Sequence, residues 1–505
     1  MSFINAIIQF ILGLIGKKDP GNTGPTSVNP APVAPIPVVK PPAKPEPKPI
    51  VIKAPVTPIT DEVMSHILVL GNYDDHLSEK DYIKPFLKTY HKRIIDAEKH
   101  SQMRNGDIFG WVKLKPKTGL SIKALQAFLA HAGFFPPEAE ADGFFGYGTQ
   151  AGVRLFQEYE RIYEGNTKMI PTGIVDKNTW TLMKKWQDAG KTAEKWTRGK
   201  LSAEFKQWLD LIQRAKDHYT NHSHLIVDTV NKAVAELNAK ADTEPLDTFQ
   251  TADWTVDPNE VHLIGIRRNE DKSGVNRKND DVFVLLINGM VFKFWGSTDP
   301  KQKANARQDE AFLVEGQHKF RFGWHNVSEG NKTKLYQGLN PFSRGVLVFR
   351  DDKATNDNSL TEADIEKGLD KNPNTTINIH WTGIGRTFGT DKPTWSAGCQ
   401  VIAGESYVDN EGNRIDCSAF AASGSAGIQG NKPTSIRRTK SAYNMFTDLV
   451  LLFRPKQVDY IMYTLGRDET LQLDALSDLH GAQVLTDTLN VLKIKHEIDP
   501  RQLGG

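Results

Sequence analysis

The chain has 505 residues, of which 25% are charged and 39% hydrophobic, and its formal net charge is +2. This length predicts several domains, and the near-neutral charge excludes the broad basic surface typical of nucleic-acid-binding proteins. The two cysteines, Cys399 and Cys417, are too few for a disulfide framework. We interpret Cys417 as a bystander, because a disulfide between them would block any chemistry of Cys399.

The chain begins with an apolar segment. Residues 2–16 are almost continuously apolar, and Lys17 and Lys18 follow. This run is shorter than the roughly 20 residues of a membrane span, and it lacks the basic start and cleavage site of a secretory signal. For the apolar helix expected at residues 1–19, three interpretations stay open: a membrane anchor, a helix at the membrane interface, or an address for export machinery. Docking on the protein itself or on a partner is the simpler alternative.

A proline-rich linker comes next. Residues 20–60 hold 13 of the 27 prolines. Such a segment favours an extended polyproline form, which at roughly 3.1 Å per residue spans on the order of 100 Å. This spacer suits a protein that must reach a polymer network, although a ligand for a proline-binding domain is the alternative.

Helical periodicity begins after a leader region at residues 61–117, which is expected to be partly helical over 81–97 and to pack on the helical segment after it. Between residues 118 and 187, apolar side chains recur at the spacing of amphipathic helices. The pattern predicts three helices, around Leu125–Leu129, Gln150–Tyr159 and Thr179–Trp186, with turn-rich segments between them. Asp176 is placed to cap the third helix.

The same segment carries turn glycines, polar residues and core aromatics in a fixed order. They are Leu125, Gln126, Gly133, Asp142, Gly143, Phe145, Gly146, Thr149, Phe156, Gln157, Gly173, Asp176 and Trp180. This order resembles the small three-helix peptidoglycan-binding domain. The resemblance implies a three-helix fold for residues 118–187 and peptidoglycan as a partner.

The pattern is helical again over residues 191–242, and we interpret residues 191–257 as a helical connector without chemistry. Its apolar positions include Phe205, Trp208, Leu209 and Ile212, then Leu225, Val230, Val234 and Leu237. His222 and His224 lie in this segment without further metal-ligand types near them, so we expect solvated side chains.

Strand patterns dominate residues 258–466. Val282–Ile287 and Met290–Trp295 flank Asn288-Gly289, which is the strongest short signal for a tight hairpin turn. Further strands are expected at residues 319–322, 345–349, 449–453 and 460–465. These runs predict a mainly β domain.

A histidine and a cysteine stand at two predicted strand ends. A β-branched run leads to His380, a glycine-rich loop follows, and Ser396-Ala397-Gly398-Cys399 precedes a short strand at Val401 and Ile402. Such ends can place an imidazole beside a thiol, which can then lose its proton and attack an acyl carbon. The Cys399 amide could stabilise the resulting oxyanion. The alternative is a buried, unreactive Cys399 and a core His380.

The order of His380, fifteen residues and Ser396-Ala397-Gly398-Cys399 resembles the signature of the L,D-transpeptidase catalytic-domain family. The resemblance implies a β-sandwich-like fold, with His380 as general base and Cys399 as nucleophile. It also implies that Ser396 and Gly398 shape the turn. Three residues depart from the family pattern: it usually has histidine at Ala397, an aliphatic residue at Gln400, and Arg or Asn at Val401. A member that hydrolyses rather than cross-links therefore stays open.

Four more residues are candidate substrate contacts. Trp381 and Trp395 flank the pair as pocket walls or as core residues. Arg350 ends a predicted strand and suits a peptide carboxylate, or else pairs with the acidic residues 351–352. His325 is predicted to touch substrate or to support the base.

Two segments complete the chain. Residues 404–440 are polar and rich in glycine and serine, which predicts an insertion that acts as a lid or as a loop without catalytic role. Residues 467–505 are predicted to form one or two helices.

The sequence thus predicts a multidomain α+β protein: a small three-helix module and a mainly β, L,D-transpeptidase-like domain at 258–466, joined by helices. The two resemblances imply a cofactor-free cysteine enzyme of the cell envelope, or an exported one. It would form a thioester between Cys399 and a peptidoglycan stem peptide and pass the acyl group to an amine or to water.

Three alternatives stay open. A zinc peptidase could use His318, His325 and His380, although no compact zinc motif is present. The β domain could be non-catalytic and the protein a wall-binding or structural one. A wall-degrading effector or lysin would fit the same residues as a housekeeping enzyme.

Overall fold

We describe a computed structural model of the chain. It describes residues 57–78, 80, 115–136, 139–196, 200–240, 244–267, 281–300, 309–329, 332–350, 362–370, 372–381, 396–421, 434–436, 439–454 and 460–467. The chain divides into two compact units, Met1–Pro45 and Glu46–Gly505, and every described residue belongs to the second. The predictions for residues 1–19, for most of the linker, for a helix at 81–97 and for the tail beyond 467 lie outside the described residues.

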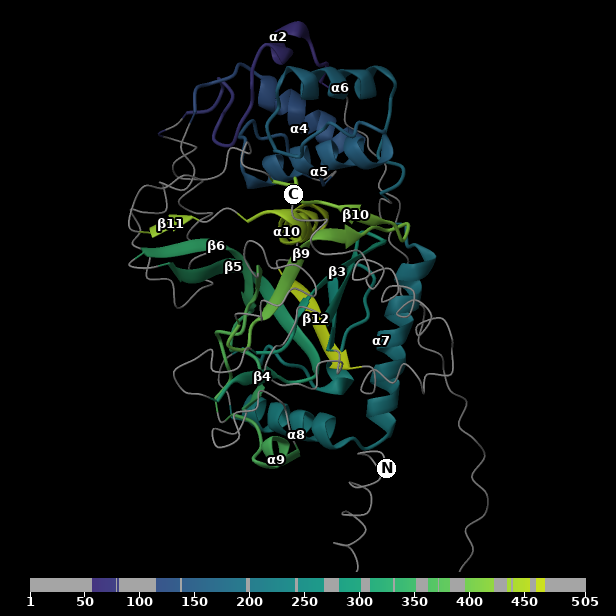
Figure 1. Cartoon of the computed structure of the whole chain (residues 1–505), viewed down its shortest axis with the longest axis vertical. Coiled ribbons are helices and arrows are strands. Elements are labelled where there is room, and N and C mark those ends of the chain that lie inside the picture. Colours follow the sequence, from purple (N-terminus) through teal and green to yellow (C-terminus); the bar gives the residue numbers. More distant parts are fainter. Residues whose placement is uncertain are drawn as a thin grey trace, which may run out of the picture. The chain divides into compact units, whose positions relative to one another are not determined.

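The three predicted helices of the module are present. They are α4 (Ser121–Ala132), α5 (Tyr147–Tyr163) and α6 (Lys177–Asp188), seen together in Figure 1. Asp176 caps α6 as predicted, because its carboxylate accepts a hydrogen bond of 2.8 Å from the Thr179 amide. The short helix α2 (Asp61–Met64) and the residues after it pack on this module, and the Trp180 indole donates to the His66 carbonyl at 2.8 Å.

Two longer helices follow, α7 (Ala203–Asn221) and α8 (Leu225–Ala239). The helical prediction for residues 191–257 is wrong beyond 239, since residues 244–257 form an irregular segment with one short 3-10 helix, η3 (Thr251–Asp253). Phe205 and Trp208 of α7 are buried in one cluster with Trp295 of the β domain. These helices therefore complete the core of that domain as well as connecting to it.

The β domain consists of short and long strands with two more helices. The strands are β1 (His262–Arg267), β2 (Asp281–Ile287), β3 (Met290–Ser297), β4 (Ala311–Leu313), β5 (Gly316–Glu329), β6 (Lys332–Pro341), β7 (Val348–Arg350), β8 (Ile379–Trp381), β9 (Gln400–Val408), β10 (Arg414–Asp416), β11 (Thr434–Ile436) and β12 (Tyr460–Arg467). The helices are α9 (Glu362–Glu366) and α10 (Ser441–Phe453).

The large sheet closes on itself. Its strands run in the order β10-β9-β3-β2-β1-β12-β5-β6-β11, while β4 and β7 pair separately. The short strand β8 pairs with both β6 and β9, the strands next to the two ends of the order, and so closes the sheet into a ring. Closure at β8 places His380 of that strand between elements that lie far apart in the sequence.

The predicted hairpin is confirmed. Strands β2 and β3 pair in antiparallel register, with Ile287 opposite Met290. Asn288 has φ 51° and Gly289 has φ 79°, the pair of left-handed residues that a type I′ turn requires. A side chain at Gly289 would also clash, because its Cβ would lie 2.2 Å from the Lys200 carbonyl oxygen.

The strand predicted at residues 449–453 is wrong, because these residues end helix α10. Nearly every residue of α10 is buried, including polar ones such as Asn444 and Asp448. A helix enclosed on all sides has no polar face, so its short apolar run has the same pattern as a buried strand.

The polar insertion predicted at residues 404–440 is also partly wrong. Strand β9 continues through Val408 and pairs with β10, and Gly404 lies in an irregular stretch of the β3–β9 ladder. Gly404 has φ 93°, and a Cβ there would lie 2.6 Å from the Trp295 ring. The glycine therefore serves a bulge within a strand and not a loop.

The module and the β domain share a polar, buried contact. Helix α10 lies between α5 and β9 in Figure 1, and both neighbours contact it. Arg154 of α5 binds Asp448 of α10 through two hydrogen bonds of 2.6 and 2.8 Å. The Tyr407 hydroxyl of β9 donates to the fully buried Glu158 at 3.1 Å. These charge-assisted bonds fix the module on the β domain in one orientation.

Candidate functional site

His380 lies on β8, and Cys399 directly precedes the neighbouring strand β9. β8 and β9 run parallel, with His380 opposite Val401, and the Gln400 amide donates to the Asn378 carbonyl at 2.8 Å. If the strand alternation continues one residue beyond each strand, His380, Asn378 and Cys399 share one face of the sheet, because His380 is opposite Val401. His380 occupies the middle of β8, whereas the sequence predicted it at a strand end.

The hydrogen bonds around His380 define its tautomer. Its Nδ1 lies 2.9 Å from the Trp381 carbonyl oxygen and 3.0 Å from the Tyr336 hydroxyl, which itself donates to that carbonyl. A carbonyl can only accept, so Nδ1 carries the proton and Nε2 keeps its lone pair. Burial lowers the pKa of His380 to about 4, and the ring is therefore neutral near pH 7. Its Nε2 has the protonation state that a general base needs.

A second imidazole stacks on this ring. The centroids of His325 and His380 are 3.9 Å apart and their planes differ by 16°. Asn340 donates to the Asn378 side-chain oxygen at 2.8 Å, which leaves the Asn378 amide nitrogen to donate to His325 Nδ1 at 3.1 Å. Burial, with the neighbouring His380, lowers the pKa of His325 well below its ordinary value. The stack thus pairs two neutral rings.

The thiol of Cys399 is hydrogen-bonded to the backbone of the neighbouring segment. Its Sγ donates to the Thr376 carbonyl at 3.4 Å and accepts from the Asn378 amide at 3.3 Å. Desolvation raises the pKa of Cys399, against the smaller opposite effects of Asn378 and the Ser396 hydroxyl. Among the described residues, no hydrogen bond joins this thiol to the His380 ring. The imidazole and the thiol therefore do not form an ion pair in this structure.

The turn before the thiol requires glycine. Gly398 has φ 134°, and a Cβ there would lie 2.5 Å from the Ala311 carbonyl oxygen. The Gly398 amide donates to the buried Ser396 hydroxyl at 3.1 Å. Ser396 and Gly398 thus form a hydrogen-bonded turn directly before Cys399.

This neutral resting pair predicts slow alkylation of Cys399 at neutral pH. Because desolvation raises the pKa of the thiol, its thiolate fraction near pH 7 is smaller than that of an unstructured cysteine peptide. In a Cys417→Ala background, the rate with iodoacetamide should rise with pH through an apparent pKa above that of the peptide, followed by intact mass. A faster reaction than the peptide at pH 7 would indicate a preformed ion pair.

The other residues predicted to contact substrate do not lie together. Trp381 is 5% exposed and packs in the main core beside Tyr336, so its side chain is a core residue. Arg350 forms an ion pair with Asp370 at 3.0 Å. The residue opposite Arg350 in the β4–β7 pair is Ala311, and Gly398 packs against Ala311. Arg350 therefore lies near the turn, with its charge already paired. Trp395 and residues 351–352 are outside the described residues.

The three histidines considered as zinc ligands do not converge. His318 binds the Val314 carbonyl through Nε2 at 2.9 Å and faces the Thr248 hydroxyl through Nδ1 at 3.1 Å. It precedes His325 by seven residues on the extended strand β5, which places the two on opposite faces. In the described part of the chain, no group of three His, Cys, Asp or Glu side chains is arranged to hold a metal ion.

Sequence reasoning missed Tyr336 and Asn378. Tyr336 lies on β6, which was not predicted as a strand, and only sheet closure brings it to His380. Asn378 stands two residues before His380, and strand alternation could have placed it on the same face.

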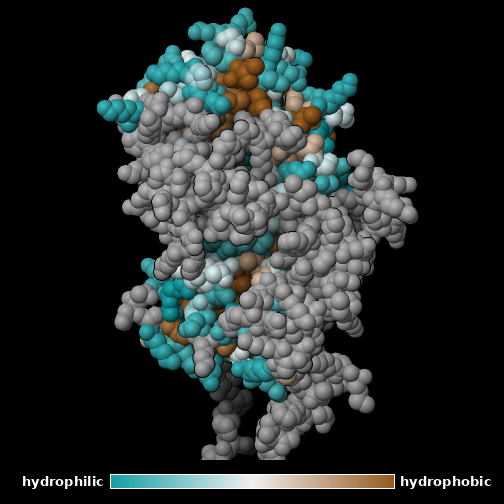
Figure 2. Space-filling view, turned by 60° about the vertical axis from the view of Figure 1, so that its left-hand side comes forward, coloured by the Kyte–Doolittle hydropathy of each residue, from teal (hydrophilic) through white to brown (hydrophobic). Residues whose placement is uncertain are grey.

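The module exposes apolar side chains to solvent. Ile67 and Leu120 are 66% and 58% exposed. The segments that carry them are neighbours, as the distance of 3.1 Å between His66 Nδ1 and the Ser121 hydroxyl shows. Figure 2 shows hydrophobic surface over the module, set among hydrophilic residues.

Comparison with known proteins identifies the module. Residues 118–183 match the family model described as a peptidoglycan binding domain, and the match does not extend into the closed sheet. No curated protein and no solved structure matches the chain. The chain therefore carries a peptidoglycan-binding domain, which points to association with the cell wall. No helix among the described residues has the length and apolar character to cross a membrane.

Proposed function

We propose that the β domain is a cysteine-dependent acyltransferase or peptidase that acts on peptidoglycan stem peptides. The observation that carries this proposal is the common face of His380 and Cys399, with the lone pair of His380 at Nε2. The peptidoglycan-binding domain, held on the same compact unit through Arg154 and Asp448, supports the choice of substrate.

The proposed reaction begins with transfer of the Cys399 proton to His380 Nε2. The sulfur attacks the stem-peptide carbonyl, a carbon–sulfur bond forms, and the carbonyl electrons move onto oxygen. When the tetrahedral intermediate collapses, the carbon–nitrogen bond breaks and the His380 imidazolium returns its proton to the leaving amine. A second amine or water then releases the acyl group from the thioester and restores the thiol.

Incubation of purified muropeptides with the full chain tests this proposal. Mass spectrometry should detect trimmed or newly cross-linked stems, and a protein adduct whose mass equals one acyl group. Protein alkylated beforehand with iodoacetamide at high pH should give neither, whereas treatment with a metal chelator should change nothing. Unchanged muropeptides with the untreated protein would overturn the proposal, and loss of activity with the chelator alone would favour a zinc peptidase.

A non-catalytic wall-binding protein is the second candidate function. It is favoured by the protonated thiol, which donates to the Thr376 carbonyl and not to His380. In that case the full chain should sediment with purified cell-wall sacculi and leave their peptides intact.

A further inference from the structure

The side chain of Gln400 is part of the candidate site, although it points away from the thiol. Gln400 is fully buried, and its amide nitrogen donates to the Gly398 carbonyl at 3.1 Å and to the Thr298 carbonyl at 3.3 Å. Its side-chain oxygen accepts from the Tyr463 hydroxyl at 2.8 Å. This polar residue stands where the family signature usually has an aliphatic one, so the bonds replace apolar packing behind the turn.

These partners determine the orientation of the Gln400 amide. Two carbonyl oxygens accept only from its nitrogen, which leaves its oxygen for a donor. Burial raises the pKa of Tyr463 well above its ordinary value, so its hydroxyl keeps the proton that it donates. The Gln400 side chain therefore donates to the Gly398 and Thr298 carbonyls through its nitrogen and accepts from the Tyr463 hydroxyl through its oxygen.

The bond to Gly398 determines the direction of the next amide. The carbonyl of Gly398 and the N–H of Cys399 belong to one trans peptide plane and point in opposite directions. Because Gln400 binds the carbonyl, the Cys399 amide points away from Gln400, and no acceptor among the described residues binds it. An amide of this orientation, on the residue that carries the thiol, is suited to receive the oxygen of a substrate carbonyl.

The Tyr463 hydroxyl passes over strand β1 at Gly265, which lies two residues beyond Leu263, the register partner of Tyr463. A Cβ on Gly265 would lie 2.2 Å from the Tyr463 hydroxyl oxygen, closer than any non-bonded contact allows. Gly265 and Tyr463 belong to the parallel strands β1 and β12, which are adjacent in the ring. The pair therefore delivers one hydroxyl from β12 to the back of the catalytic turn.

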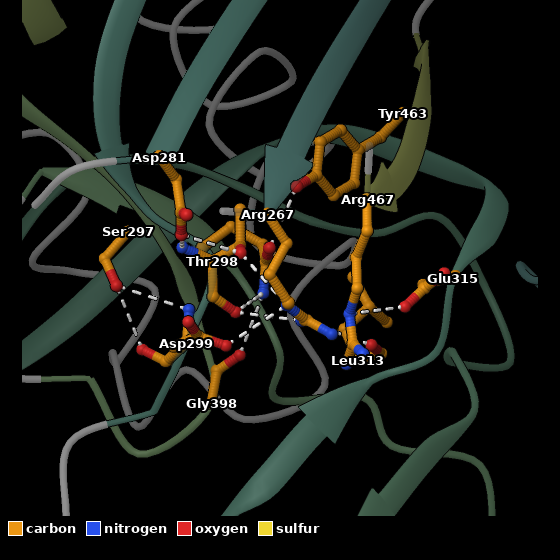
Figure 3. A network of polar contacts seen from close by, with 11 residues as sticks. Arg267, Asp281, Ser297, Thr298, Asp299, Leu313, Glu315, Gly398, Tyr463 and Arg467 are labelled. Carbon is orange, nitrogen blue, oxygen red and sulfur yellow. Dashed lines mark hydrogen bonds and ion pairs between the residues drawn. The ribbon is translucent and has the colours of Figure 1, made fainter. Parts of the chain in front are cut away.

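A buried network of charged side chains holds Thr298, whose carbonyl is the second acceptor of the Gln400 amide. Arg267 forms an ion pair with Asp299 at 3.1 Å and donates to the Thr298 carbonyl, also at 3.1 Å. Asp281 accepts from both the amide and the hydroxyl of Thr298, at 2.6 and 2.8 Å. Figure 3 shows these side chains converging on Thr298, with Gly398 at the edge of the same network. Thr298 is thus held from both sides.

From this geometry we infer that Gln400 and Tyr463 are positioning residues, which orient the Gly398–Cys399 peptide so that its amide stabilises the oxyanion. The inference depends on the proposed function. It rests on the polar side chain of Gln400, at a position where the signature that this segment resembles usually has an aliphatic residue.

The test compares Tyr463→Phe with Tyr407→Phe in the full chain. Both tyrosines are fully buried, and each change removes one hydroxyl, but Tyr407 bonds Glu158 at the module contact. Acyl transfer to muropeptides needs the oxyanion donor, whereas alkylation by iodoacetamide needs only the thiolate. Tyr463→Phe should lower kcat about 10-fold, and it should leave KM and the pH profile of Cys399 alkylation unchanged. This loss is smaller than the roughly 10²–10³-fold loss that follows removal of a whole oxyanion donor, because the Cys399 amide itself remains. Tyr407→Phe should leave all three quantities unchanged.

Gln400→Met provides a second variant, since it keeps the length of the side chain and removes both polar atoms. It should lower kcat at least as much as Tyr463→Phe. If Tyr463→Phe turns over muropeptides at the wild-type rate, the inference is overturned and the proposed function stands. An equal fall in turnover and alkylation would mean a structural role for Tyr463 and would also overturn the inference. A wild-type protein that leaves muropeptides unchanged would overturn both.

Discussion

Replacement of Cys399 by alanine is expected to abolish muropeptide turnover, by about four orders of magnitude or more, because we propose Cys399 as the nucleophile and loss of a nucleophile has an effect of that size. No other thiol can substitute for it, because Cys417 is 1% exposed and packs in the core next to β10. Product masses and the acyl adduct provide the measurement, with Cys417→Ala as the matched control. That control should keep the wild-type rate, although it removes a buried side chain.

Two results would contradict this expectation. Turnover that survives in Cys399→Ala would show that another group attacks the substrate. Turnover lost in Cys417→Ala, with the protein folded, would mean that the bystander interpretation of Cys417 is wrong. Cys399→Ala should still sediment with sacculi, since residues 118–183 supply wall binding.

Replacement of Asp448 by alanine is expected to destabilise the protein by about 3–5 kcal/mol, the usual cost of breaking one side of a buried ion pair. Arg154 would keep its charge in a site where its side chain is 10% exposed, without the two carboxylate oxygens that it binds. Urea unfolding, followed by tryptophan fluorescence, measures the loss. The module should also become more sensitive to proteolysis, because Arg154 and Asp448 join α5 to α10.

The surface pair Lys184–Asp188 is the matched control. Its side chains are 40% and 61% exposed, so Asp188→Ala should cost less than about 1 kcal/mol. The double variant Arg154→Leu/Asp448→Leu should recover much of the loss, because no unpaired charge is then buried. If Asp448→Ala is no worse than Asp188→Ala, the pair does not hold the module on the β domain.

Local chemistry was sufficient for several features. The three helices of the module were predictable because each shows an apolar stripe with turn residues at its ends, and Asp176 caps α6 at the predicted position. Asn288-Gly289 determined the hairpin because few other pairs accept two left-handed residues in succession. The order of His380 and Cys399 in the chain also predicted a pair at two strand ends, and the structure places His380 on β8 and Cys399 directly before β9.

Only the tertiary structure decided which residues surround His380 and Cys399, and which elements pack around the sheet. The buried helix α10 could not be distinguished from a strand, since burial on every side removes the periodicity of the pattern. Tyr336, His325 and Tyr463 reach the site through strand pairings between residues far apart in the sequence, and no local pattern records such pairings. The neutral state of His380 and Cys399 also follows from desolvation, which depends on the packing of the whole sheet and not on neighbours in the chain.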